Sequence, residues 1–280
     1  MIRRPQPPGP AAVYRAKGPA EKEETRNRER ILAGKAPSYA VYKREEIKEA
    51  LHKLFHGKCA YCESRYAATQ PMDVEHWRPK AEVHEANGTV LRHQYAFLAA
   101  DWTNLLPSCI DCNRERSHEV VFPNSVRKKL VLGKGNRFPV NGSRATDRPS
   151  LANEVALLLS PYWDVPEEHL EFLREGVVRP KKRSVKAEHS IEVYALNRSG
   201  LVNERYERVL LVEKSIHTIR KLAKALENTA DSKVLNIVQD LISYEMTALR
   251  ALRAEPQPYA LLARQLTDQF FASPDGAPLR

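Results

Sequence analysis

Cysteine is scarce in this 280-residue chain, which contains only four. Long apolar runs are missing as well, and the tightest apolar cluster is VALLL, residues 155–159. A helix that spans a bilayer needs about 18 or more consecutive apolar residues, so a membrane-spanning protein is excluded and no membrane partner is expected. The N-terminal segment MIRRPQPPGP lacks the apolar stretch of a secretory signal peptide. We therefore expect a soluble, cytoplasmic protein.

Acidic residues are outnumbered by basic ones, 35 against 45, which gives a net charge of +10. Positive charge is concentrated in residues 126–150, where seven basic residues face a single acid, Asp147, and in RPKKRSVK, residues 179–186. Clustered lysine and arginine favour a polyanionic partner such as nucleic acid, because phosphates are bound mainly through charge. A basic surface that only keeps the protein soluble is the alternative.

The first part of the chain divides at about residue 37. Residues 1–37 are rich in proline and charge and predict an extended or weakly ordered arm that could bind a partner, with a short helix over 21–32. Apolar residues at helical spacing predict a second helix over 39–56, which Gly57 ends. We place a module over residues 38–150, and we expect its segment 119–150 to be irregular.

The last part of the chain, residues 151–280, is expected to be a short β-hairpin followed by helices. The strands are predicted in VALLLSPYWD and GVVRP, on either side of the acidic PEEHLEFL. From about Val185 the apolar residues recur at helical spacing, and the segment 258–271 predicts a final helix. These apolar stripes are interpreted as a helical core or a partner-docking face.

All four cysteines fall into two matched pairs, Cys59-x-x-Cys62 and Cys109-x-x-Cys112. Two residues between cysteines let both thiolates reach one ion from a tight turn, and two such turns complete a tetrahedral site. The pattern predicts a structural Zn²⁺ site that is closed to substrate. An iron centre, or redox-active or unpaired thiols, are the other interpretations.

Between and beside the cysteine pairs lie Glu75, His76, Asn104 and Asn113. Carboxylate and amide oxygens are hard ligands that suit Mg²⁺ or Mn²⁺ and leave positions for water and a phosphate oxygen. A neutral histidine can accept a proton from such a water near neutral pH. A zinc ion that joins the two pairs would draw these residues together, so we expect a hydrolytic centre here.

Several short strings, together with the helical region, resemble those of one protein family. The strings are KCAYCES, EHWRPK, W-x-NLLPSC-x-x-CN, GKGNRFP and LLLSPYWD-x-PEEHLEF. The order E-H…N…N, interleaved with two CxxC pairs, looks like the HNH nuclease motif. The full set is similar to the PtuB-like HNH component of Septu and retron systems.

The resemblance implies an α+β fold, in which a zinc-stapled ββα-metal (HNH) nuclease core within residues 38–150 precedes a mainly α-helical C-terminal region. It implies that Glu75 and Asn113 hold a catalytic Mg²⁺ or Mn²⁺, that His76 is the general base, and that Asn104 braces the loop. Asp73, two residues before Glu75, is a reserve ligand.

The resemblance also implies an endonuclease that hydrolyses phosphodiester bonds, with phage DNA as the first expectation. Its implied partners are an ATPase subunit of the PtuA type and, in retron systems, a reverse transcriptase with its DNA. Cleavage of tRNA or other RNA, and a non-catalytic zinc-stapled subunit that binds nucleic acid or aids assembly, are the alternatives. The residues expected to contact phosphate are Arg78, Lys80, Arg114 and Arg116.

Overall fold

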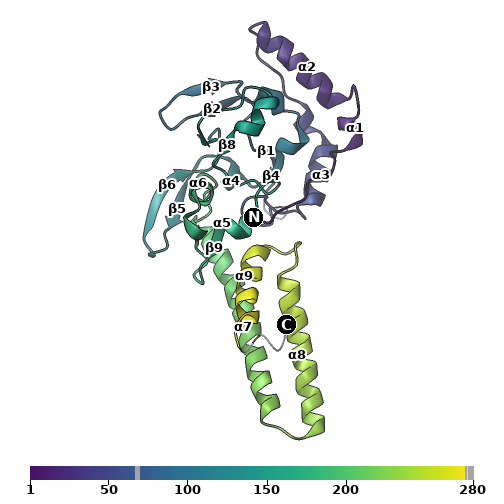
Figure 1. Cartoon of the computed structure of the whole chain (residues 1–280), viewed down its shortest axis with the longest axis vertical. Coiled ribbons are helices and arrows are strands. Elements are labelled where there is room, and N and C mark those ends of the chain that lie inside the picture. The colour runs from purple at the N-terminus through teal and green to yellow at the C-terminus, as the bar shows by residue number, and fades with distance from the viewer. Residues whose placement is uncertain (67–69, 275, 277–280) are drawn as a thin grey trace.

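Two parts of different architecture make up the protein: a body of short strands and helices, and a long helical hairpin that projects from it (Figure 1). The computed structural model describes residues 1–66, 70–274 and 276. The mixed α/β composition with a helical C-terminal region agrees with the expected class. The helices are α1 (Ala11–Tyr14), α2 (Pro19–Leu32), α3 (Glu45–Leu54), α4 (Ile110–Asn113), α5 (Pro166–His169), α6 (Val185–Val193), α7 (Ser199–Glu227), α8 (Ser232–Leu252) and α9 (Ala260–Phe271).

The strands of the described ranges pair into antiparallel two-stranded sheets, each with a register of only a few residues. The pairs are β1 (Asp73–His76) with β4 (Leu105–Ser108), β2 (Glu82–His84) with β3 (Val90–Arg92), β5 (Arg116–Val121) with β6 (Arg127–Leu132), β7 (Val140–Asn141) with β8 (Val155–Ala156), and β9 (Leu170–Phe172) with β10 (Val178–Pro180). Such small sheets do not form layers of their own, so the core between them fixes their positions.

The N-terminal segment is packed against the body: residues 1–10 contain no helix or strand, which agrees with an extended arm, but they are not weakly ordered. Met1 and Ile2 are buried, and the backbone N–H of Arg4 donates to the carbonyl of Pro161. The N-terminus lies where the body meets the helical hairpin (Figure 1). The short helix predicted over 21–32 is confirmed as α2, which begins two residues earlier at Pro19.

The helix predicted over 39–56 is confirmed over most of its length. It is broken at Arg44, whose extended backbone separates a 3-10 turn, Val41–Lys43, from α3. Ile47 and Leu51 of α3 are fully buried, as their spacing predicts. Gly57 follows with a φ of +67°, a left-handed conformation that suits glycine and ends the helix.

Two strand predictions are wrong. Part of the segment 119–150, expected to be irregular, forms the hairpin β5–β6, whose register runs from Arg116 opposite Leu132 to Val121 opposite Arg127. In the predicted hairpin the strand in GVVRP is confirmed as β10, but its partner is β9 within PEEHLEFL, and only the first two residues of VALLLSPYWD are a strand. Leu158 and Leu159 of that run are buried in the core as irregular chain.

The C-terminal region is helical, as expected. Helices α7 and α8 run side by side as an antiparallel pair, and α9 packs against α7 near the body (Figure 1). Asp231 caps α8 by accepting from the backbone N–H groups of Lys233 and Val234. Within the described ranges, no helix combines the length and the apolar composition needed to cross a bilayer.

Candidate metal centre and active site

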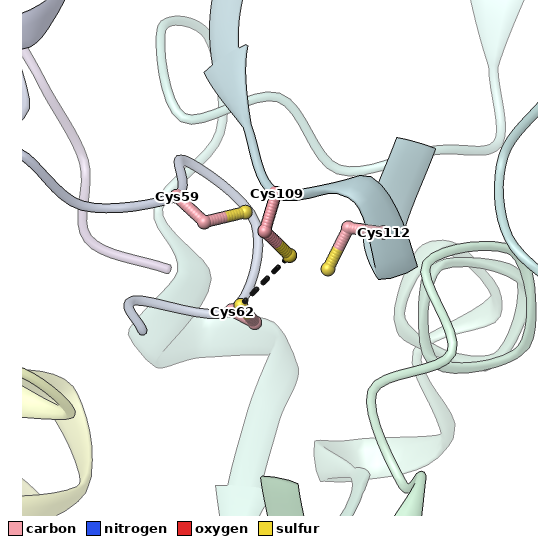
Figure 2. Close-up of side chains that lie close together, drawn as sticks. All are labelled: Cys59, Cys62, Cys109 and Cys112. Carbon is pink, nitrogen blue, oxygen red and sulfur yellow. Dashed lines mark hydrogen bonds between the residues drawn. The ribbon is translucent and has the colours of Figure 1, made fainter. Parts of the chain in front are cut away.

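The four cysteines converge at one point in the body (Figure 2). Cys59 and Cys62 lie in the turn after α3, and Cys109 and Cys112 lie at the start of α4. All four are buried, and their sulfur atoms lie within 4.8 Å of one another. In a tetrahedral site with zinc–sulfur bonds of about 2.3 Å, neighbouring sulfurs are about 3.8 Å apart. The Cys62 and Cys109 sulfurs are 3.8 Å apart, so the cluster could hold zinc.

A buried arginine completes the surroundings of the cysteines. The guanidinium of Arg198, just before α7, lies 3.5 Å from Cys112 Sγ, 3.6 Å from Cys62 Sγ and 3.7 Å from Cys109 Sγ. Burial would lower the pKa of Arg198, but the charges of the three thiols outweigh it and raise that pKa well above its ordinary value. Four thiolates around one dication carry a net charge of about −2, which a guanidinium partly offsets. Arg198 lies far from the cysteines along the chain, so the cysteine pattern does not point to it.

The sheet β1–β4 places the acidic-histidine pair beside the second cysteine pair. Glu75 lies opposite Leu106 in the register, and β4 leads directly into Cys109 and α4. Glu75 and Asn113 therefore line the same cavity, of about 690 Å³. These are the two oxygen donors that the sequence analysis assigned to a divalent ion, and their side chains fit a hard cation that keeps some of its waters.

His76 is buried and has a defined tautomer. Its Nε2 lies 2.9 Å from the carbonyl oxygen of Ala99, which can only accept, so Nε2 carries the proton. Its Nδ1 is then the acceptor, 3.5 Å from the ammonium of Lys80. Burial, and after it the positive charge of Lys80, hold the pKa of His76 well below its usual value. The imidazole is therefore neutral at neutral pH, and its unprotonated nitrogen is Nδ1, which faces Lys80.

Glu75 has a partner that the sequence analysis did not identify. The ammonium of Lys134, which is fully buried, lies 2.6 Å from Glu75 Oε1 and donates to the carbonyl of His76 at 3.0 Å. Burial raises the pKa of Glu75, and the charge of Lys134 opposes that rise. One carboxylate oxygen is thus paired with a cation, and the other could bind a metal ion.

Asn113, the last residue of α4, donates through Nδ2 to Asp73 Oδ2 at 3.0 Å. Its amide oxygen is the atom that could bind a metal ion. Arg114 also holds Asp73, through two hydrogen bonds of 2.9 and 3.0 Å. Asp73, the reserve ligand of the sequence analysis, thus has two partners of its own and orients Asn113.

Asn104 joins the two sides of the loop that follows β1. Its Oδ1 accepts from the backbone N–H of Arg78 at 2.7 Å, and its Nδ2 donates to the carbonyls of Arg78 and Leu98 at 2.9 and 3.2 Å. The side chain is buried, so these bonds replace those that water would make. This geometry is that of a brace, as the sequence analysis expected, and any effect on catalysis stays a prediction.

The four residues predicted to contact phosphate have different surroundings. Lys80 lines the cavity beside Glu75. Arg114 also lines it but is paired with Asp73, and Arg116 is paired with Asp111 at the surface. Arg78 is mostly buried, with its Nε 2.7 Å from Glu154 and its guanidinium over the Trp77 ring. The cavity residues that were not predicted include Tyr42, Lys43 and Lys48.

Comparison with known proteins identifies the family. The chain is 33% identical to Septu protein PtuB of Bacillus mycoides strain KBAB4 over 245 residues, which are 84% of this chain and 77% of that protein. The chain belongs to the Septu PtuB family. A second PtuB, from Bacillus thuringiensis, is 24% identical over 86% of this chain and 74% of its own length.

Septu protein PtuA of Bacillus mycoides is also similar to this PtuB-family chain. The identity is 29% over 163 residues, which are 57% of this chain but only 20% of PtuA. The similarity therefore concerns a minor part of PtuA. No protein-family model matches the chain.

Proposed function

We propose that this PtuB-family protein is a metal-dependent endonuclease of the HNH type and an effector of an anti-phage defence system. The observation that supports the proposal is the cavity that Glu75 and Asn113 share, whose lining residues Tyr42 and Lys80 both contact the buried His76. A protein that only binds nucleic acid needs no buried neutral histidine next to two oxygen donors. The zinc-stapled ββα arrangement expected from the sequence is part of the same proposal.

The residues divide the work of phosphodiester hydrolysis among them. Glu75 and Asn113 would hold a Mg²⁺ or Mn²⁺, which when bound polarises the scissile phosphate and stabilises the leaving oxygen. His76 takes a proton from the attacking water at Nδ1, because its Nε2 proton is already engaged by Ala99. Asn104 fixes the backbone just after His76 and so keeps the imidazole in place. The four cysteines hold zinc and take no part in the chemistry.

The cavity wall supports a nucleic acid as the substrate. Lys43, Lys48 and Lys80 line it together with Tyr42, whose ring is 4.9 Å from the His76 ring in an edge-on arrangement. Three ammonium groups around one cavity favour a chain of phosphates over a single anionic group. We propose phage DNA as the substrate; RNA, including tRNA, is the alternative that the same chemistry permits.

A plasmid-nicking assay tests the proposal. Wild-type protein is expected to nick supercoiled DNA with Mg²⁺ or Mn²⁺, and EDTA is expected to stop it. His76→Ala should reduce the rate by at least about 10²-fold, because a general base contributes about 10²–10⁴-fold. The matched control is His84→Ala, since the His84 side chain is exposed and pairs with Glu82 at the surface. Equal rates for His76→Ala and wild type would contradict the assignment, and tRNA tested in parallel separates the two substrates.

A PtuA-type partner belongs to the same proposal. The family assignment, and the similarity of part of the chain to PtuA, support an assembly in which this protein acts with an ATPase subunit. Where a reverse transcriptase is encoded nearby, we propose a retron complex. Size-exclusion chromatography of the co-expressed proteins is expected to show one complex, and repeating the nicking assay on it shows whether assembly activates cleavage.

A further inference from the structure

The segment Gly133–Lys134–Gly135, which follows β6, carries a lysine with an unusual position. Lys134 has no exposed surface, and its ammonium contacts Glu75 Oε1 at 2.6 Å and the carbonyl of His76 at 3.0 Å. A buried ammonium is costly unless charged and polar partners surround it. Lysine at this position therefore needs an explanation beyond packing.

The backbone of the same segment is hydrogen-bonded to residues of α4, on the opposite side of the site from Glu75. The N–H of Lys134 donates to the carbonyl of Cys112 at 2.9 Å, and that of Gly135 donates to the carbonyl of Asn113 at 2.6 Å. Glycine is required at position 133, where φ is +131° and a Cβ atom would lie 1.9 Å from the carbonyl oxygen of Arg114. The close approach of this loop to α4 is thus built into the sequence.

Lys134 consequently spans the gap between the two proposed ligands. Its backbone is fixed to the end of α4, which carries Asn113, and its ammonium is fixed to the carboxylate of Glu75 on β1. The cavity wall includes Gly135 and Asn136 but not Lys134, so the ammonium lies behind Glu75, away from the space that a phosphate would enter.

We propose that Lys134 is a positioning residue that holds the Glu75 carboxylate at the correct distance and orientation from Asn113 for one divalent ion. The inference rests on the proposed function, because it assumes that these two residues share an ion. Groups that orient a metal ligand in this way typically contribute about 10–100-fold to metal affinity. Lys134 touches neither substrate nor ion and acts only through Glu75.

The test is Mn²⁺ binding, measured by titration calorimetry on the zinc-loaded full chain, with zinc content determined in the same samples. Lys134→Met is expected to weaken Mn²⁺ binding by about 10–100-fold. The zinc content of the four-cysteine site is expected to stay the same. Lys129→Met is the matched control, because Lys129 is an exposed lysine on the neighbouring strand β6. This control should bind Mn²⁺ like the wild type.

Two ligand variants separate failure of the inference from failure of the proposed function. Glu75→Gln and Asn113→Ala should both weaken Mn²⁺ binding, and wild-type affinity in both would overturn the ion site itself. If both weaken binding while Lys134→Met retains wild-type affinity, only the role of Lys134 is wrong.

A double variant keeps the proposal testable if Lys134→Met does not fold. That substitution leaves the buried Glu75 carboxylate without its cation, so Glu75→Gln in the same chain should recover most of the lost melting temperature. If Glu75→Gln restores none of it, the pairing of Lys134 with Glu75 does not stabilise the site, and the proposal is overturned.

Discussion

At the scale of single residues, the site consists of buried polar groups whose hydrogen bonds are made to protein atoms instead of water. His76, Glu75 and Asn104 are all buried, and each has a defined partner in Ala99, Lys134 or Arg78. The sequence predicts which residue types take part, because an acidic-histidine pair between two cysteine pairs has few structural uses. It does not predict Lys134, whose role arises only when a distant loop folds against β1.

Asn104 provides a test at this scale. Asn104→Ala removes three hydrogen bonds and leaves the partly buried backbone N–H and carbonyl of Arg78 without their partner, whereas the Leu98 carbonyl still accepts from Asp101, so we expect the free energy of unfolding to fall by about 2–4 kcal/mol. Urea denaturation measures this change in the free energy of unfolding. Asn87→Ala, in an exposed turn where Asn87 accepts only from Thr89, should change stability by less than about 1 kcal/mol. Similar losses in the two variants would argue against a bracing role.

Lys80 provides a second test. It lines the cavity 3.5 Å from His76 Nδ1, with its ammonium over the Tyr42 ring. Lys80→Met is expected to weaken binding of DNA and to lower cleavage at low DNA concentration more than at saturation, because the lost contact is to phosphate. Cleavage rates measured over a range of DNA concentrations check this, and an unchanged half-saturating concentration would remove Lys80 from the binding surface.

At the scale of elements, helices were predicted better than strands. Ile47 and Leu51 repeat at helical spacing, and that local pattern suffices to predict α3. Strand β6 exposes Arg127, Lys128 and Lys129 in a row, so its sequence shows basic charge and no alternation. Its pairing with β5 depends on tertiary packing, because Val120 and Leu132 are buried against Ala195 from the α6–α7 connection.

Arg198 connects two elements, the cysteine cluster and the start of α7. Arg198→Met removes the guanidinium that faces three sulfurs, so we expect zinc to be lost to EDTA several-fold faster than from the wild type. Arg250→Met on the exposed side of α8 is the control. Zinc release can be followed with a chromogenic chelator, and equal rates in the two variants would show that the arginine does not stabilise the cluster.

At the scale of the whole molecule, the net charge is +10, but only some of the basic residues lie at the cavity of the proposed active site. Many basic residues are engaged in ion pairs, including Arg116 and Arg148 at the surface, and Lys48 and Arg114 are paired as well although they line the cavity with Lys43 and Lys80. The sequence therefore predicts a polyanionic partner but not the face that meets it, because ion pairing is decided by the fold.

Salt dependence tests this distribution of charge. In EDTA, which prevents cleavage, the affinity for DNA should fall steeply with salt, and the triple variant Lys43→Met/Lys48→Met/Lys80→Met should reduce the slope of log affinity against log salt by about 0.9 per lost phosphate contact. Fluorescence anisotropy measures both slopes. A triple variant with the slope of the wild type would place the nucleic acid on another face.

The most direct measurement is an anomalous difference map from crystals of the zinc-loaded protein soaked in Mn²⁺, recorded at the manganese and zinc edges. The account predicts zinc at the four cysteines and one manganese peak in the cavity of Glu75, within about 2.0–2.3 Å of its carboxylate and of the Asn113 oxygen, with His76 Nδ1 facing a bound water. Manganese absent from that cavity, or found only at the cysteines, would contradict it.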